Sequence, residues 1–491
     1  MTNKQVGRRR FLDGEFHRTV HLFVWAPALA LLVAMLPFAA HADDPETIPT
    51  HRASLGHPKT SDLEGKRLKN TGKGMPSVEG PFPDTVNMEF LGQLTNEELG
   101  VSKLVFTGAS FLSDIWGWTS KDPKTGDIIN EYAIVGTSSG VAFVRITDPV
   151  NPEFLGRVPT TDTTTIRNFW WDIKTYKNHA YWTTEVNNAG VAIFELTQLD
   201  DLPQAPPDTT LEADARYTAD GYIRAHNISI NEDTGFAYLT GVSKDPAVDP
   251  GFTDDGTIIL DLKGDPLAPV EVGQILNIDS HDAQVVTYAG DDADPNGMSY
   301  QGKEIAFIFN GGDLEVGIYD VTKKSNIREI SVTTYAGASF THQGWLTEDH
   351  GFLLMGDEED ELFGLSDPRN PDLPDTARTY IWDVRDLDNP VVIGTFDSPA
   401  ASIDHNLFVK GDRVYQAHYT AGIRVLNSSG VANGILSEVA HMDTEPRLPN
   451  NHMNKNINIF VGPWGVFPFF ESGTIIASDG LNGLIISRLV Q

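Results

Sequence analysis

Residues 113–160 read SDIWGWTSKDPKTGDIINEYAIVGTSSGVAFVRITDPVNPEFLGRVPT, and this stretch decides the fold class. It contains four short runs rich in β-branched and aromatic residues, each bounded by Gly, Asp, Asn or Pro. The runs cover residues 113–118, 131–138, 140–149 and 152–160. Four such strands in succession predict one four-stranded antiparallel blade of a β-propeller.

Parts of this blade recur along the chain. RTYIWDVRDLDNPVVIGTF (378–396) repeats the third and fourth runs and keeps the Asp-x-x-Asn-Pro turn between them. Looser copies occupy 315–332 and 256–275, and shorter ones occupy 190–199 and 422–431. A spacing of roughly 45–60 residues is typical of propeller blades. The pattern predicts seven blades, with six or eight as the alternatives.

The two ends of the chain are expected to share the last blade. The final blade, 462–489, lacks an outer strand, whereas MEFLGQLT (88–95) closely matches the outer strand EFLGRVPT (153–160). A strand from the N-terminal end that completes the C-terminal blade would leave no open sheet edge. The sequence therefore predicts an all-β, seven-bladed propeller over residues 88–491, preceded by a flexible leader at 43–87.

Residues 1–42 have the pattern of an export signal. Three arginines at 8–10 precede an apolar stretch at 22–40, and AHA at 40–42 offers the small residues that a signal peptidase reads. RRRFL (8–12) also resembles a twin-arginine signal, with a plain basic region as the alternative. We expect an exported protein, periplasmic or extracellular, without a membrane span in the mature chain.

The composition excludes several function classes. With 36 basic and 68 acidic residues, the formal net charge is −32, which opposes nucleic-acid binding and favours cations. An acidic surface suited to a saline medium explains the charge equally well. The chain has no cysteine, so disulfides, thiolate metal sites and covalently attached c-type haem are excluded.

The innermost strand of each predicted blade begins with polar residues. Histidine recurs there in four blades although the whole chain has only 14 histidines, and Asp, Gln or Asn lies at or beside the same place. The histidines are His226, His281, His342 and His405. The neighbouring residues are Asp114, Asp172, Asp282, Asp404, Gln343, Asn227 and Asn406.

Imidazoles that converge near a channel axis can bind a divalent metal. Histidine combined with carboxylate or amide groups suits zinc, copper, iron or nickel. We therefore predict the four histidines as ligands and the Asp, Gln and Asn side chains as orienting groups or extra ligands. The alternatives are a hydrogen-bonded network that only fixes blade register, and a metal-free catalytic site.

Two acidic segments are further candidates for cations. GDDADPNG (290–297) carries Asp291, Asp292, Asp294 and Asn296 as part of a calcium loop does, but it lacks the later bidentate Glu. A solvated turn is the alternative there. GDEEDE (356–361) follows a predicted strand, and we interpret it as a solvated edge that could also collect cations.

Six tryptophans lie in or beside the innermost strands: Trp116, Trp118, Trp170, Trp171, Trp345 and Trp464. Packing between blades is the simpler interpretation, and a stacking surface for a sugar or aromatic ligand is the other. The sequence has no nucleophile elbow, phosphate loop, dinucleotide fingerprint or HExxH helix. It therefore predicts no nucleotide cofactor.

The chain resembles the choice-of-anchor B family of bacterial secreted proteins, built from LVIVD-type propeller repeats. The resemblance runs from about residue 86 onward and rests on SDIWGW, WWDIKTYKNHAY, AHNISINEDTGFAYLTG, HDAQVVTYAGDDAD, THQGWLTEDHGFLL and ASIDHNLFVKGDRVYQAHYTAGIRVL. It implies export and a β-propeller but no settled activity. Many relatives carry a C-terminal anchoring region, whereas this sequence stops at Gln491 after its last strand, which favours a periplasmic or released protein.

Three functions follow as hypotheses. The first is an exported metal-binding propeller that recognises a small-molecule or protein ligand. The second is a metal-dependent oxidase or hydrolase with its active site at the channel histidines. The third is a structural or adhesive module in which the histidines brace the channel.

Overall fold

The computed structural model describes residues 81–101, 111–162, 170–361, 376–400, 402–446 and 460–490. All of them belong to one compact unit, Thr50–Gln491. The predicted signal segment and most of the predicted leader lie outside the described residues. No helix in the described ranges is long and apolar enough to cross a membrane.

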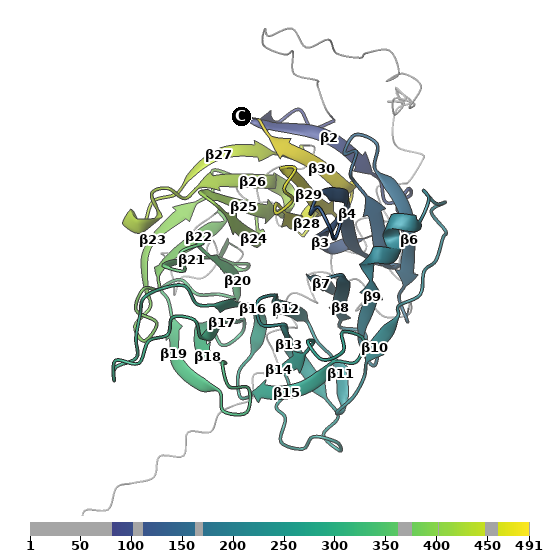
Figure 1. The fold of residues 1–491 in the computed structure, drawn as a ribbon. Helices are drawn as coiled ribbons and strands as arrows, with labels where there is room; N and C mark the ends of the chain where they lie inside the picture. Colours follow the sequence, from purple (N-terminus) through teal and green to yellow (C-terminus); the bar gives the residue numbers. More distant parts are fainter. Residues whose placement is uncertain are drawn as a thin grey trace, which may run out of the picture. The chain divides into compact units, whose positions relative to one another are not determined.

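The described residues form seven antiparallel sheets arranged as a ring, which confirms the predicted seven-bladed propeller (Figure 1). Blade 1 consists of β3 (Leu112–Lys121), β4 (Ile128–Thr137), β5 (Gly140–Arg145) and β6 (Glu153–Pro159). Blade 2 consists of β7 (Trp171–Tyr176), β8 (His179–Thr184), β9 (Val191–Glu195) and β10 (Ala215–Tyr217). Blade 3 consists of β12 (Asn227–Asn231), β13 (Phe236–Lys244), β14 (Gly256–Asp261) and β15 (Val270–Ile275), with β11 (Tyr222–Arg224) added beside β13.

The remaining blades follow the same order from the channel outward. Blade 4 consists of β16 (Ser280–Thr287), β17 (Glu304–Asn310), β18 (Glu315–Asp320) and β19 (Arg328–Thr334). Blade 5 consists of β20 (Thr341–Leu346), β21 (Phe352–Asp357), β22 (Arg378–Asp383) and β23 (Val391–Asp397). Blade 6 consists of β24 (Asp404–Lys410), β25 (Arg413–His418), β26 (Gly422–Asn427) and β27 (Ser437–Met442). Blade 7 consists of β28 (Pro463–Phe467), β29 (Thr474–Asp479), β30 (Gly483–Leu489) and β2 (Met88–Leu94).

The predicted closure of the ring is confirmed. Strand β2 pairs antiparallel with β30, with Met88 opposite Leu489 and Leu94 opposite Leu484. One further pairing was not expected, because the leader was predicted to run to residue 87. Strand β1 (Thr85–Val86) pairs with β27 and so joins blade 6 before the chain enters blade 7.

Burial follows the position of each strand within its blade. All seven residues of β17 (EIAFIFN) are buried, because middle strands are covered on both faces by neighbouring blades. Outer strands face water, and in β23 Val391 is 51% exposed. The apolar core therefore lies between blades, and the innermost strands are left to present polar side chains to the channel.

Candidate metal centre in the channel

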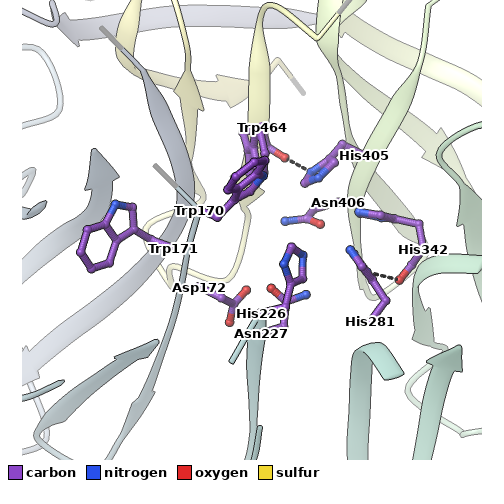
Figure 2. Close-up of a pocket in the computed structure, with 10 residues that line it drawn as sticks. All are labelled: Trp170, Trp171, Asp172, His226, Asn227, His281, His342, His405, Asn406 and Trp464. Atoms are coloured by element: carbon purple, nitrogen blue, oxygen red, sulfur yellow. Dashed lines mark hydrogen bonds between the residues drawn. The ribbon is translucent and has the colours of Figure 1, made fainter. Parts of the chain in front are cut away.

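The four predicted histidines lie side by side along one arc of the channel, one on each of four consecutive blades (Figure 2). The ring centroids of His226 and His281 are 4.3 Å apart, those of His281 and His342 are 4.5 Å apart, and those of His342 and His405 are 4.3 Å apart. The Trp464 indole continues the arc, 4.7 Å from His405. The structure thus brings all four predicted ligands together.

The aspartates predicted for the other blades do not share the histidine position. The carboxylate of Asp114 accepts a hydrogen bond from the Ile173 N–H of the next blade at 2.9 Å, and Asp172 accepts one from Ile228 at 3.1 Å. Gln343, which follows His342 directly, accepts from Leu407 in the same manner at 2.9 Å. Asp114 and Asp172 therefore correspond to the residue after each histidine.

The histidine position itself is filled by Ser113 in blade 1, Trp171 in blade 2 and Trp464 in blade 7. The residues after the four histidines are Asn227, Asp282, Gln343 and Asn406. In this second layer Asp114, Asp172 and Gln343 accept a backbone N–H of the next blade, whereas Asp282 accepts from the adjacent Ala283 N–H. Its side chains are braces between strands, and no hydrogen bond from them to a histidine ring occurs within the described ranges.

A small cavity lies between the imidazoles. It measures about 10 Å³ and is lined by Trp170, Trp171, Asp172, His226, Asn227, His281, His342, His405, Asn406 and Trp464. A space of this size holds about one water molecule or one ion. In Figure 2 the four imidazoles lie along one side of the group, whereas the Trp171 indole extends away from them.

Hydrogen bonds at Nδ1 fix the tautomer of three histidines. His281 donates to the carbonyl of His342 at 3.1 Å, and His405 donates to the carbonyl of Trp464 at 2.5 Å. Nδ1 of His226 lies 2.7 Å from the carboxylate of Glu185. Because a backbone carbonyl can only accept, neutral His281 and His405 carry the proton on Nδ1 and the lone pair on Nε2, the arrangement that metal-binding histidines use.

Glu358, which directly follows β21, faces two of these Nε2 atoms. Its Oε2 lies 3.6 Å from Nε2 of His342, and its Oε1 lies 3.6 Å from Nε2 of His405. The three ligand atoms all lie within 4.8 Å of one another. The Tyr419 hydroxyl donates to Oε1 of Glu358 at 2.9 Å and holds the carboxylate in place.

Burial suppresses the charge on this group of residues. Desolvation lowers the pKa of His405 to about 3 and lowers the pKa values of His281 and His342 well below their ordinary value. It also raises the pKa of Glu358 to about 8. His281, His342 and His405 are therefore neutral near pH 7.

Below the histidines, a buried lysine compensates part of the negative charge of the second layer. Nζ of Lys174 lies 2.8 Å from Asp172 and 3.4 Å from Asp114. Burial opposes the charged amine, but these carboxylates and Asp282 raise the pKa of Lys174 above its ordinary value. Burial raises the pKa of Asp282 to about 7 and that of Asp172 well above its ordinary value.

Aromatic side chains pack across the channel below this layer. Trp116 contacts Phe467 and Phe408 at centroid distances of 5.0 and 5.7 Å, and Trp345 contacts Phe408 at 5.0 Å. Nζ of Lys174 lies 4.6 Å above the Trp116 ring. Trp116 and Trp345 are therefore packing residues, whereas Trp170, Trp171 and Trp464 line the cavity.

The interpretation of residues 356–361 as a solvated edge is wrong. Asp357, Asp360 and Glu361 are each 0% exposed, because the turn after β21 folds inward between blades 5 and 6. Asp404 is also buried, at 2% exposure. Its carboxylate belongs to this acidic group, and its pKa is raised by burial and then by Asp357 and Glu358.

In the acidic loop at 290–297, two carboxylates accept hydrogen bonds from backbone N–H groups. Asp294 accepts from the N–H groups of Asn296 and Met298 at 3.0 and 2.9 Å. Asp292 accepts from Ala293 and from Leu387 of blade 5, both at 2.7 Å. Asp291 and Asn296 are exposed. The calcium site proposed for these residues stays a prediction.

Sequence reasoning missed Tyr419 and Glu185, and it noted Glu358 only as one member of the acidic run 356–361. Glu358 lies in an acidic run, so its position directly after a predicted strand was the available signal. Glu185 also directly follows a strand, β8, but nothing in its spacing distinguishes it from other acidic residues. Both carboxylates reach the histidines from the ends of second strands rather than from innermost strands.

Comparisons with known proteins do not assign a family. No family model matches the chain, and no curated protein matches it. Among solved structures, it is similar to a protein from Lactobacillus plantarum at 11% identity and a TM-score of 0.43, covering 75% of this chain and 89% of that one. It is also similar to U3-55K at 9% identity and a TM-score of 0.47, covering 77% and 95%.

Proposed function

We propose that this chain is an exported LVIVD-type propeller of the choice-of-anchor B kind that binds a divalent transition metal in its channel. The metal site would serve a module that recognises a small-molecule or protein ligand. One observation carries the proposal: the Nε2 atoms of His342 and His405 face opposite oxygens of the Glu358 carboxylate, each at 3.6 Å. Export is supported by the N-terminal pattern, which lies outside the described residues.

The facing atoms require something between them. Nε2 of His405 carries a lone pair, because its Nδ1 proton is donated to the Trp464 carbonyl. A lone pair that faces a carboxylate oxygen is repulsive unless a proton or a cation lies between the two. The raised pKa of Glu358 keeps a proton there near pH 7, and a bound divalent cation would displace it. In tetrahedral zinc sites, neighbouring ligand atoms lie about 3.4 Å apart, which is close to the separations here.

The kinds of ligand atom narrow the choice of metal. Two imidazoles and one carboxylate suit zinc, and the same set with open positions suits non-haem iron(II). His281 is the neighbouring imidazole that could complete the coordination, since its Nδ1 is also tied to a backbone carbonyl. His226 lies at the far end of the arc, where Glu185 orients it. It would contribute to the electrostatic field around the ion.

Elemental analysis of the full chain, purified without a histidine tag, tests the proposal. We expect one equivalent of metal after reconstitution, and we expect its loss in His342→Gln, His405→Gln and Glu358→Gln. His350→Gln is the matched control, because His350 lies in a turn away from the channel histidines, where its Nδ1 accepts the Ala289 N–H. Substoichiometric metal with unchanged thermal stability would contradict the proposal. Misfolding of all three variants would favour the brace hypothesis instead.

A metal-dependent enzyme is the second candidate. It is favoured by a set of three ligands beside a cavity that holds about one water molecule, because a catalytic metal keeps one position open. Cobalt(II)-loaded protein separates the two functions. Azide should change the visible spectrum if a position is open, and an unchanged spectrum would argue against catalysis at this metal.

A further inference from the structure

The acidic group between blades 5 and 6 contains carboxylate oxygens without partners. Both side-chain oxygens of Asp404, Oε2 of Glu361 and Oδ1 of Asp360 are buried and accept no hydrogen bond. Glu361 and Asp360 are 0% exposed, and Asp404 is 2% exposed. No ion pair from lysine, arginine or histidine reaches any of these three carboxylates in the described part of the chain.

Asp357 shows how a buried carboxylate is satisfied in the same turn. Its Oδ2 accepts from the Tyr335 hydroxyl at 2.6 Å and from the Ser339 N–H at 2.8 Å, and its Oδ1 accepts from the Phe340 N–H at 2.8 Å. Asp357 is therefore a structural anchor. In the acidic group, Oδ2 of Asp360 accepts from the Tyr380 hydroxyl at 3.2 Å and Oε1 of Glu361 accepts from the Asp404 N–H at 3.4 Å. The other oxygen of each and both oxygens of Asp404 are the acceptors that still lack a partner.

The backbone is shaped to admit the Asp404 carboxylate. A Cβ atom on Gly356 would lie 2.5 Å from Oδ2 of Asp404, so a larger residue there would displace this oxygen. The charge of Arg378 acts on Asp360, but Arg378 forms its ion pair with Asp397 on the outer strand at 2.6 Å. Buried carboxylates without a positive partner need a proton or a metal cation.

We propose that Asp360, Glu361 and Asp404 form a second cation site, distinct from the histidine centre and selective for Ca²⁺. All of its donors are carboxylate oxygens, which favour hard cations over the metals that prefer imidazole. Without the ion, the three carboxylates do not place one oxygen each within 4.8 Å of one another. The ion would therefore draw the side chains together and lock the β21 turn onto β24.

Thermal unfolding of the chelator-treated full chain tests this site. Ca²⁺, titrated to about 1 mM as suits extracellular calcium modules, should raise the Tm of the wild type. Asp404→Asn and Glu361→Gln should abolish that rise. Both variants should melt no lower than the wild type without Ca²⁺, because each replaces an acidic side chain whose ionised form is buried without a positive partner. Gly356→Ala should weaken the Ca²⁺ response without changing any charge.

Asp479→Asn is the matched control. Asp479 is equally buried, but its oxygens accept from the Thr444 hydroxyl and from the Leu481 and Asn482 N–H groups. The Asp479→Asn variant should have a lower Tm and keep the Ca²⁺ response.

A wild type that does not respond to Ca²⁺ would overturn the proposal, and so would a response that survives in Asp404→Asn. A response lost in His342→Gln but kept in Asp404→Asn would move the ion to the histidine centre. Because zinc content is measured separately, failure of one site leaves the other standing.

Discussion

At the scale of single residues, the channel depends on one buried cation. Lys174 is 12% exposed and lies between Asp172 and Asp114, and the charge of Asp282 also acts on it. Removing one partner from a buried ion pair leaves the other charge uncompensated, which costs far more than the pair contributes. The stability of the second layer should therefore be sensitive to this one side chain.

Lys174→Met should destabilise the protein by about 3–5 kcal/mol, because three carboxylates lose their countercharge. Adding Asp172→Asn to this variant should recover part of the loss. Chemical denaturation of the single and double variants measures both effects. Lys121→Met is the control: its partner Glu471 is exposed, so the expected change is less than about 1 kcal/mol. A Lys174→Met variant as stable as this control would contradict the assignment.

A second residue-scale effect concerns His418, at the end of β25. It is 2% exposed, and neither ring nitrogen has a hydrogen-bond partner in the described part of the chain. Burial, followed by the charge of Arg424, lowers the pKa of His418 to about 3. Since the unfolded chain binds this proton near the ordinary pKa of about 6.5, the stabilising effect is present above that pH and is lost as pH falls toward 3.

Acidification from about pH 7 to about pH 4 should therefore cost roughly 3 kcal/mol through His418 alone. His418→Gln should flatten this part of the stability profile in denaturant titrations. His441→Gln should act in the opposite direction, because the hydrogen bond that His441 donates to Glu438 raises the pKa of His441. If the wild type and His418→Gln lose the same free energy of unfolding as the pH falls, the His418 ring is not buried in its neutral form.

At the scale of elements, the innermost strands are tied together from one blade to the next. Gln343 on β20 accepts the Leu407 N–H of β24, and it is 3% exposed. Gln343→Met should cost about 1–3 kcal/mol, because the buried N–H loses its acceptor. Gln343→Glu keeps an acceptor, as Asp114 and Asp172 do in their blades, and should melt closer to the wild type. Equal melting temperatures for the two variants would contradict this role.

Much of the element scale was predictable from the sequence. Strand runs, Asp-x-x-Asn-Pro turns and the repeat spacing are local signals, and they placed the seven innermost strands and the closing strand β2. The histidine layer was predictable for the same reason, because His226, His281, His342 and His405 recur at one strand position. Strand β1 was not predictable, since two residues carry no periodicity.

The rest of the site depends on contacts between distant segments. Glu358 meets His405 only because blades 5 and 6 are adjacent and the turn after β21 folds inward. Composition alone suggested a solvated acidic edge there, and only packing shows that Asp360 and Glu361 are buried. The offset between Asp114 and the histidines is likewise invisible until the hydrogen bond to Ile173 fixes the register.

At the scale of the whole molecule, stability depends on the pairing of β2 with β30. Deleting residues 1–94 removes β1 and β2 and exposes the edge of β30, so the variant should melt lower and aggregate. Deleting residues 1–80 leaves both strands in place and should melt like the full chain. Scattering during thermal melts distinguishes the two. Equal behaviour of the two deletions would show that ring closure contributes little.

This closure also has a consequence for the order of folding. Glu89 and Arg488, which form an ion pair across the two strands, are 399 residues apart in sequence. During synthesis from the N-terminus, β2 is made before any of the blade strands that follow it, yet it must wait until β30 leaves the ribosome. The entropy of closing so long a loop grows only slowly with length, but contacts of such high sequence separation form late. The folding intermediate most prone to aggregation is therefore a nearly complete propeller, in which six blades are formed and the seventh still lacks its outer strand.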